Sequence, residues 1–156
     1  MKLLIVDDDS SLCSALARSL IRLGHAARSA TSVTSALKLV ESEAPTAVLT
    51  DLDLGAGGDG VDLITRLRQE GSQVPAILMT GSDPVMARAR LGRAGLDEIA
   101  LLEKPFAFEE LVKVLAELLP QDSASLQSGA AVRQTRPTPV AAVLHAVGRA
   151  FGGRGP

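Results

Sequence analysis

Residues 3–9 read LLIVDDD, four consecutive aliphatic side chains followed directly by three carboxylates. A short, wholly aliphatic run is typical of a β-strand that is buried on both faces, as strands are in parallel sheets. The three acidic residues then stand where such a strand ends. This stretch decides the fold class, because further runs of the same kind recur along the chain up to residue 119.

Aliphatic runs alternate with amphipathic stretches through this region. Three more strong runs and one weaker run lie at residues 47–50, 76–79, 99–102 and 25–27. Between them, apolar residues recur every three or four positions, as on the buried face of a helix; these stretches cover 12–23, 33–40, 61–67 and 111–118. Asp9 or Ser10, and Asp83 with Pro84, are helix-start signals. The alternation predicts an α/β domain with a five-stranded parallel sheet and helices on both faces.

The composition limits the classes of function. Of 156 residues, 46% are hydrophobic, yet none is Trp or Tyr, so the core must be aliphatic and base-stacking recognition is disfavoured. A net charge of −2 provides no basic field for phosphate backbones, and we expect no direct nucleic-acid binding. One cysteine, Cys13, excludes an internal disulfide. No membrane span or signal peptide is evident, so we expect a cytoplasmic protein.

The charge balance changes near Pro120. Residues 1–119 hold 17 acidic and 12 basic side chains, whereas residues 120–156 hold one acidic and four basic ones. We therefore predict a domain over 1–119, a flexible Ser-, Ala- and Pro-rich linker over 120–138, and a tail over 139–156 without an output domain. The tail has apolar residues at helical spacing. It is either a short amphipathic helix that docks on a partner or on the acidic domain, or a segment with no defined partner.

Polar groups end four of the predicted strands, at Asp7–Asp9, Asp51, Thr80–Ser82 and Glu103–Pro105. Ligands bind at the carboxyl ends of parallel strands. If Asp7, Asp8 and Asp51 converge there, each close pair repels by about 4 kcal/mol, so a cation must neutralise them. Oxygen ligands at a partly open site suit Mg²⁺, or Mn²⁺ in its place. The alternative is a solvated cluster at residues 7–9 that only caps a helix.

The set Val6-Asp7-Asp8, Asp51, Thr80 and Lys104-Pro105 resembles the receiver domain of response regulators in two-component signal transduction, over residues 1–119. The resemblance implies a flavodoxin-like, doubly wound sheet of strand order 2-1-3-4-5 in a single-domain, chemotaxis-type architecture. It also implies that Asp51 accepts a phosphoryl group from a sensor histidine kinase or a histidine phosphotransfer protein. The modified domain would signal to an unidentified downstream protein through an interaction surface, and it is not a conventional turnover enzyme. Oligomeric assembly stays open.

The resemblance also assigns roles to single residues. Lys104 and Thr80 would contact the phosphoryl group, with space left by Gly81 beside them. Asp8 would bind the metal ion directly, Asp7 largely through water, and Asp53 through its backbone carbonyl. The Lys104–Pro105 bond is often cis in the family. Without the resemblance, Lys104 would be a surface lysine and Thr80 a residue chosen for its β-propensity.

The sequence departs from the family pattern in several places, among them the two that follow. Gly55 stands where a proline is common, and the glycine-rich loop at residues 55–60 is slightly longer than usual, which predicts a mobile loop. The switch pair would be Thr80 and Leu101, but Leu101 stands where an aromatic residue is expected. Signalling must then use another packing change, or none.

Two other functions fit parts of the pattern. A phosphate-independent binding module could have the same fold. The acids of Asp51-Leu52-Asp53 are also spaced as in haloacid-dehalogenase-type phosphatases, although there the pair usually ends the first strand.

Overall fold

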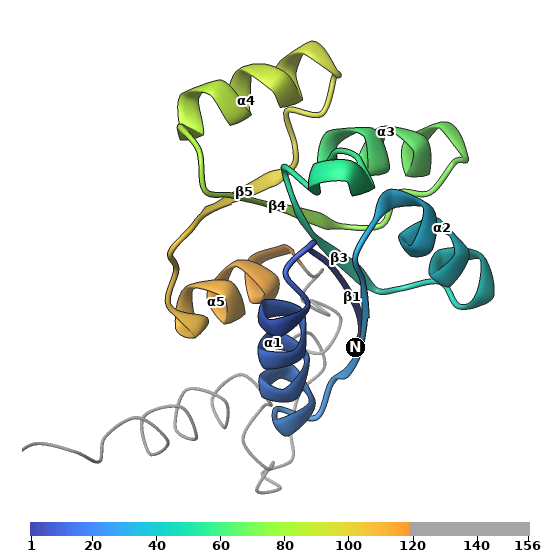
Figure 1. Cartoon of the computed structure of the whole chain (residues 1–156), viewed down its shortest axis with the longest axis vertical. Helices are drawn as coiled ribbons and strands as arrows, with labels where there is room; N and C mark the ends of the chain where they lie inside the picture. The colour runs from blue at the N-terminus through green and yellow to red at the C-terminus, as the bar shows by residue number, and fades with distance from the viewer. Residues whose placement is uncertain (119–156) are drawn as a thin grey trace, which may run out of the picture. The chain divides into compact units, whose positions relative to one another are not determined.

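The computed structural model describes residues 1–118 (Figure 1). Met1–Phe106 form one compact unit with the five strands, and the last helix belongs to a second unit and is described by itself. In chain order the elements are β1 (Lys2–Val6), α1 (Ser10–Arg22), β2 (Ala26–Ala30), α2 (Val33–Ser42), β3 (Ala47–Asp51), the 3₁₀ turn η1 (Gly55–Gly57), α3 (Gly60–Gln69), β4 (Ala76–Thr80), α4 (Pro84–Arg93), β5 (Ala100–Glu103) and α5 (Phe108–Leu118). None of these helices is long and apolar enough to cross a bilayer.

Some predictions fall on residues that the structure does not describe. The linker at 120–138 and the tail at 139–156 lie outside the described residues, and the domain limits 1–119 stay a prediction with them.

The five strands form one parallel sheet in the order β2-β1-β3-β4-β5. This is the flavodoxin-like order, so the predicted fold is confirmed. The weak run at residues 25–27 marks only the start of β2. That strand lies at the sheet edge and leaves most of its side chains partly or fully exposed, which explains why its sequence has no continuous aliphatic run.

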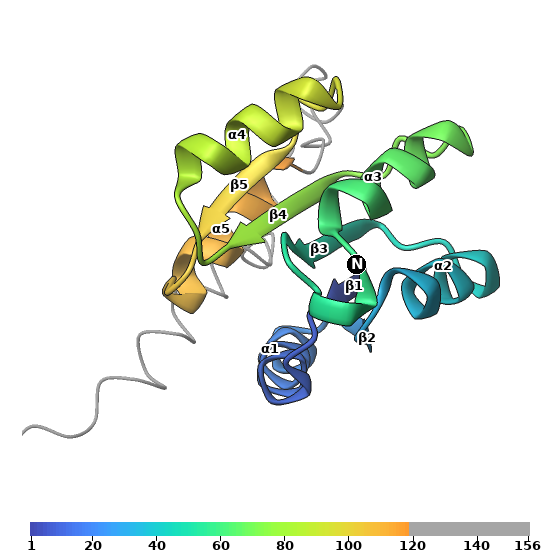
Figure 2. The same cartoon turned by 45° about the horizontal axis from the view of Figure 1, so that its top comes forward.

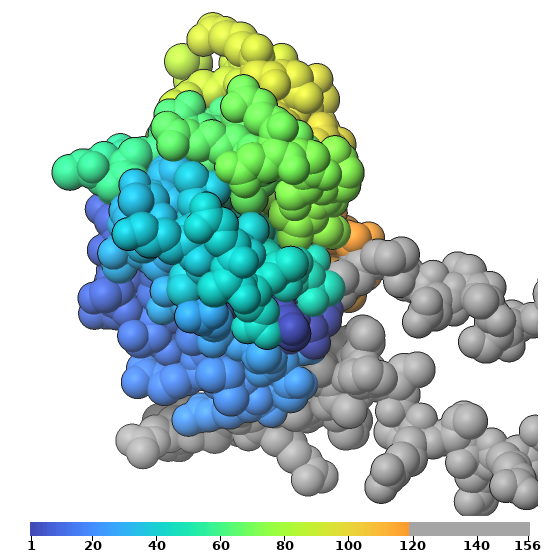
Figure 3. All heavy atoms as spheres, turned by 90° about the vertical axis from the view of Figure 1, so that its right-hand side faces the viewer, coloured from blue at the N-terminus to red at the C-terminus, as the bar shows by residue number. Residues whose placement is uncertain are grey.

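Helices cover both faces of the sheet. Side chains alternate between the faces along each strand, and Leu4, Val48 and Leu78 share one core cluster with residues of α2, α3 and α4. Figure 2 shows α1 on the opposite side of the strands from those three helices. In Figure 3, α2 in cyan and α3 in green lie next to each other, as their contacts require. The central strands are therefore buried on both sides by aliphatic residues.

Capping residues set the start of the helices at this sheet's carboxyl edge. The Asp9 carboxylate accepts hydrogen bonds from the backbone N–H groups of Ser11 and Leu12, at 2.8 and 3.1 Å. Asp83 accepts from the N–H of Val85, with Pro84 in the first turn of α4. Both predicted caps are confirmed, and both connections from strand to helix are short.

The glycine-rich loop after β3 is closely packed. Gly55 and Gly58 adopt φ values of +55° and +110°, which residues with a side chain rarely adopt. Gly60 is needed for space instead, because a Cβ there would lie 2.1 Å from the carbonyl oxygen of Asp51. The sequence predicts mobility from these glycines, and the structure adds a second reason for them, the close approach of the loop to its neighbours.

Candidate functional site

The ends of the central strands meet at one edge of the sheet. Val6 pairs with Thr50 in the register of β1 and β3, so Asp7 and Asp51 leave neighbouring strands at the same level. The N–H of Lys104 donates to the carbonyl of Thr80 at 2.7 Å, which brings the ends of β4 and β5 together. These ends surround an open pocket lined by Asp8, Asp51, Leu52, Asp53, Gly55, Thr80, Gly81, Ser82 and Lys104.

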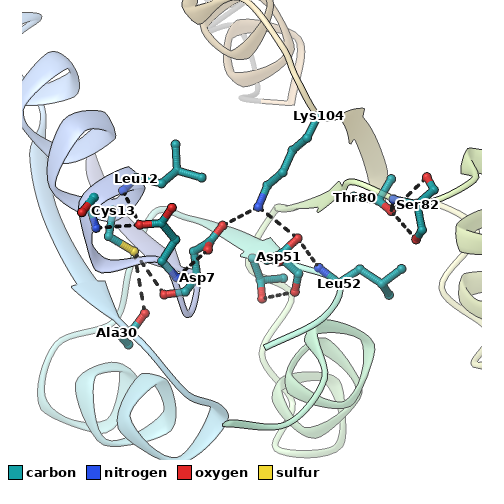
Figure 4. Close-up of polar contacts among 12 residues, drawn as sticks. Asp7, Leu12, Cys13, Ala30, Asp51, Leu52, Thr80, Ser82 and Lys104 are labelled. Carbon is teal, nitrogen blue, oxygen red and sulfur yellow. Dashed lines mark hydrogen bonds and ion pairs between the residues drawn. The ribbon is translucent and has the colours of Figure 1, made fainter. Parts of the chain in front are cut away.

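Lys104 joins two of the carboxylates. Its Nζ lies 2.6 Å from Oδ2 of Asp7 and 3.2 Å from Oδ1 of Asp51 (Figure 4). Burial alone would lower the pKa of this ammonium. The hydrogen bond to Asp7 and the charge of Asp51 outweigh burial, so the pKa of Lys104 is raised. The side chain therefore carries its positive charge at neutral pH and directs it between β1 and β3.

The Asp51 carboxylate is partly buried and held in place by a hydrogen bond and an ion pair. Its side chain is 13% exposed, and its Oδ1 accepts the backbone N–H of Leu52 at 3.0 Å. Burial raises the pKa of Asp51, Lys104 opposes that rise, and the nearby charge of Asp7 adds to it. The carboxylate lines the pocket, so an incoming group can reach it.

The three acids of the predicted metal site also converge. Asp7, Asp8 and Asp51 each offer an oxygen within 4.8 Å of the other two. Asp7 is buried and both of its oxygens already accept hydrogen bonds, one from Lys104 and one from the N–H of Asp9 at 2.9 Å. Asp8 is exposed. With Lys104 beside them, the three carboxylates leave a net charge of −2, which a hard divalent cation would neutralise.

Asp53, Thr80 and Gly81 line the same pocket. The Asp53 carboxylate accepts the N–H of Gly55 at 2.8 Å, so that side chain is engaged in its own loop. Thr80 is buried, and its hydroxyl contacts the side chain, carbonyl and N–H of Ser82 at 3.0 to 3.3 Å. A Cβ on Gly81 would meet nothing within 4 Å, so there is open space beside Thr80.

Leu101 lies apart from these polar contacts. It is a partly buried residue of β5 that packs against the core cluster shared with α4, beside its neighbour Leu78. An aliphatic side chain at this position offers no hydrogen bond. The Lys104–Pro105 peptide bond is cis.

Sequence reasoning gave no separate role to two contributors to the site. Ser82 binds the Thr80 hydroxyl, and the Thr-Gly-Ser spacing of a Ser/Thr turn could have indicated it. Gly60 permits the start of α3 to lie against the backbone of Asp51. No periodicity marks that contact, because it depends on how two segments approach in space.

Comparisons with known proteins identify the family. The family model described as the response regulator receiver domain matches residues 3–116. The response regulator MprA of Mycobacterium avium (strain 104) is 34% identical over 128 residues, which cover 80% of this chain and 55% of that protein. MprA of Mycolicibacterium vanbaalenii is 35% identical over 119 residues, with 76% and 50% covered. The chain thus spans about half the length of the curated relatives it matches.

Solved structures share the fold. The receiver domain of NtrX from Brucella abortus has a TM-score of 0.67 at 26% identity, covering 74% of this chain and 96% of that one. The BeF3-activated N-terminal receiver domain of RstA from Klebsiella pneumoniae has a TM-score of 0.69 at 26% identity, with 78% and 100% covered. The chemotaxis protein CheY4 of Vibrio cholerae, at 22% identity and a TM-score of 0.69, has the same fold. With nearly all described residues matched, this chain belongs to the receiver domain family of the response regulators of two-component signalling.

Proposed function

We propose that Asp51 accepts a phosphoryl group from a sensor histidine kinase or a histidine phosphotransfer protein, and that the modified domain changes its affinity for a downstream protein. One observation carries this proposal. The Asp51 carboxylate lines an open pocket and lies 3.2 Å from the Lys104 ammonium, with Asp7 and Asp8 beside it. The family match supports the same chemistry.

In the proposed reaction, an oxygen of ionised Asp51 attacks the phosphorus of a phosphohistidine. The P–O bond to Asp51 forms as the P–N bond breaks, and the imidazole leaves and takes up a proton. Such transfers depend on positioning and on neutralisation of charge rather than on a strong protein nucleophile. Here the Leu52 N–H and Lys104 orient Asp51. Lys104 also supplies a point charge for the oxygens of the phosphoryl group.

The acidic cluster fits a bound Mg²⁺ or Mn²⁺. In the proposal, Asp8 and Asp51 would hold the ion directly, Asp7 would act through water, and the backbone carbonyl of Asp53 would be a further ligand. Asp7 suits an indirect role, since both of its oxygens already accept protein hydrogen bonds. When bound, the cation neutralises charge on the phosphoryl oxygens. Thr80, next to the space at Gly81, is proposed to donate its hydroxyl to one of those oxygens.

The product of the proposed reaction is the phosphorylated domain itself, which acts as a signal, rather than a released metabolite. Self-phosphorylation and hydrolysis of the aspartyl phosphate are the reactions that we propose, and the described residues are proposed to bind no nucleic acid. We place the protein in the cytoplasm, where kinases of this class act.

The test is intact-mass analysis after incubation with Mg²⁺ and a small acyl phosphate. The wild-type chain should gain one phosphoryl group, and Asp51→Asn should gain none. Asp53→Asn is the matched control, since it alters an acid of the same loop and should still be modified. An unmodified wild type, or an equal adduct on Asp51→Asn, would overturn the proposal and favour a phosphate-independent binding module.

A further inference from the structure

An ion pair links α4 to the loop that follows Asp51. Arg90 lies in α4, and its guanidinium contacts the carboxylate of Asp59, the N-cap residue of α3. The two side chains are 44% and 21% exposed, so the pair lies at the surface but is partly shielded. Neither residue lines the pocket around Asp51. The pair therefore connects a surface helix with the site without taking part in its chemistry.

The Asp59 end of this link is tied to the backbone of Asp51. The second oxygen of Asp59 accepts the N–H of Val61 at 2.7 Å, and Asp59 forms an isolated β-bridge with Asp53. The next residue, Gly60, donates its N–H to the carbonyl of Leu52 at 3.0 Å and lies directly against the Asp51 carbonyl. Asp59 cannot shift far unless the backbone around Asp51 moves with it.

The beginning of α4 has a different anchor. Thr80 contacts Ser82, and Ser82 directly precedes Asp83, the N-cap of α4. A threonine hydroxyl has one proton to donate. If Thr80 donates that proton to a phosphoryl group on Asp51, the hydroxyl no longer donates it to Ser82. Phosphorylation then removes one contact at the start of α4, whereas Asp59 stays fixed beside Asp51, so a shift of α4 must break its ion pair with Arg90.

At the switch position on β5 this chain has Leu101 in place of an aromatic residue. Leu101 is apolar and packs against the core, so it has no hydrogen bond to exchange when Thr80 moves. The exposed part of α4 carries Val85 and Met86, which are 72% and 57% exposed. The position of α4 therefore sets how this apolar surface is presented.

We propose that the Arg90–Asp59 ion pair restrains α4 in its unphosphorylated position and so opposes the phosphorylated conformation. This inference rests on the function proposed above and adds its regulation. An interaction that forms in only one of two states lowers the affinity of every ligand that selects the other state. Removal of the pair should then strengthen the binding of a phosphoryl mimic.

Beryllofluoride with Mg²⁺ is a suitable probe, with affinity measured by titration calorimetry because the chain has no Trp or Tyr to report by fluorescence. Arg90→Ala should bind it about twofold to fivefold more tightly than the wild type, the range that an exposed ion pair provides. Asp59→Asn should do the same, since Asn still caps α3. The double variant should gain no more than either single one, because each removes the same pair.

Arg93→Ala is the control, since it removes the same charge from α4 at an exposed position that has no ion pair among the described residues. Arg93→Ala should leave the affinity for beryllofluoride unchanged. High salt screens the ion pair, so it should reduce the difference in affinity between Arg90→Ala and the wild type. Equal or weaker binding by Arg90→Ala, or gains that add in the double variant, would refute the restraint alone. A wild type that neither binds beryllofluoride nor accepts phosphate would refute both proposals.

Discussion

Gly60→Ala tests whether the close packing of α3 against Asp51 positions the site. The added Cβ would lie 2.1 Å from the Asp51 carbonyl oxygen and 3.0 Å from a methyl carbon of Leu78. Backbone cannot yield as a flexible side chain can, so we take the upper end of the overpacking range, about 3 kcal/mol. Alanine in a helix returns at most about 1 kcal/mol. The net loss of about 2 kcal/mol should lower Tm by roughly 8 °C in a domain of this size.

The matched control for this prediction is Gly92→Ala, in the last turn of α4. A Cβ there meets only the end of the Asp97 side chain, at 3.2 Å. Thermal melting by circular dichroism should show Gly92→Ala as stable as the wild type or more so. Intact-mass kinetics with an acyl phosphate should show slower modification of Gly60→Ala, since its Asp51 backbone must shift. If Gly60→Ala melts and reacts like the wild type, the proposed positioning is wrong.

Further predictions concern the charged cluster and the buried thiol. In metal-free buffer at neutral pH, Asp51→Asn should melt no lower than the wild type. The reason is that the pKa of Asp51 is raised in the folded state, so ionisation of its carboxyl group lowers the stability of the fold as the pH rises through this raised pKa. For the same reason the rate of acyl-phosphate modification, followed by intact mass, should fall on acidification at a higher pH than an ordinary aspartate would give. Lys104→Met should lose about 3 kcal/mol in denaturant titration, because buried Asp7 loses the ammonium that its carboxylate pairs with. Added Mg²⁺ should restore part of the loss, and an unchanged midpoint would contradict the ion-pair geometry. Burial raises the pKa of the Cys13 thiol to about 11, so thiol reagents should react with it only in denaturant, and rapid native labelling would refute that burial.

The restraint on α4 gives the departures from the family pattern a physical meaning. Leu101 offers no hydrogen bond on β5, whereas the Arg90–Asp59 pair is a polar contact between α4 and the loop that follows Asp51. A surface ion pair contributes little to stability, about 1 kcal/mol or less. That is still enough to shift a two-state equilibrium severalfold without making either state inaccessible.

Local patterns in the chain determined the class of fold and indicated the candidate site. Continuous aliphatic runs predict central strands, because only strands buried on both faces can lack polar side chains. The polar ends of such runs could be picked out as site candidates, since parallel strands place those ends at one edge of the sheet. These ends are Asp51, Thr80 and Lys104. The edge strand β2 was harder to define, because its exposed side chains follow no such rule.

Only the tertiary structure decided which of these polar groups touch. From the sequence, Lys104 could pair with Asp51 or with a phosphoryl oxygen, and the fold brings its Nζ closer to Asp7 than to Asp51. Two contacts could not be predicted from spacing along the chain: Gly60 packs against Asp51, and Arg90 pairs with Asp59. Periodicity reports which face of an element is buried, whereas such contacts depend on how two elements approach each other in space.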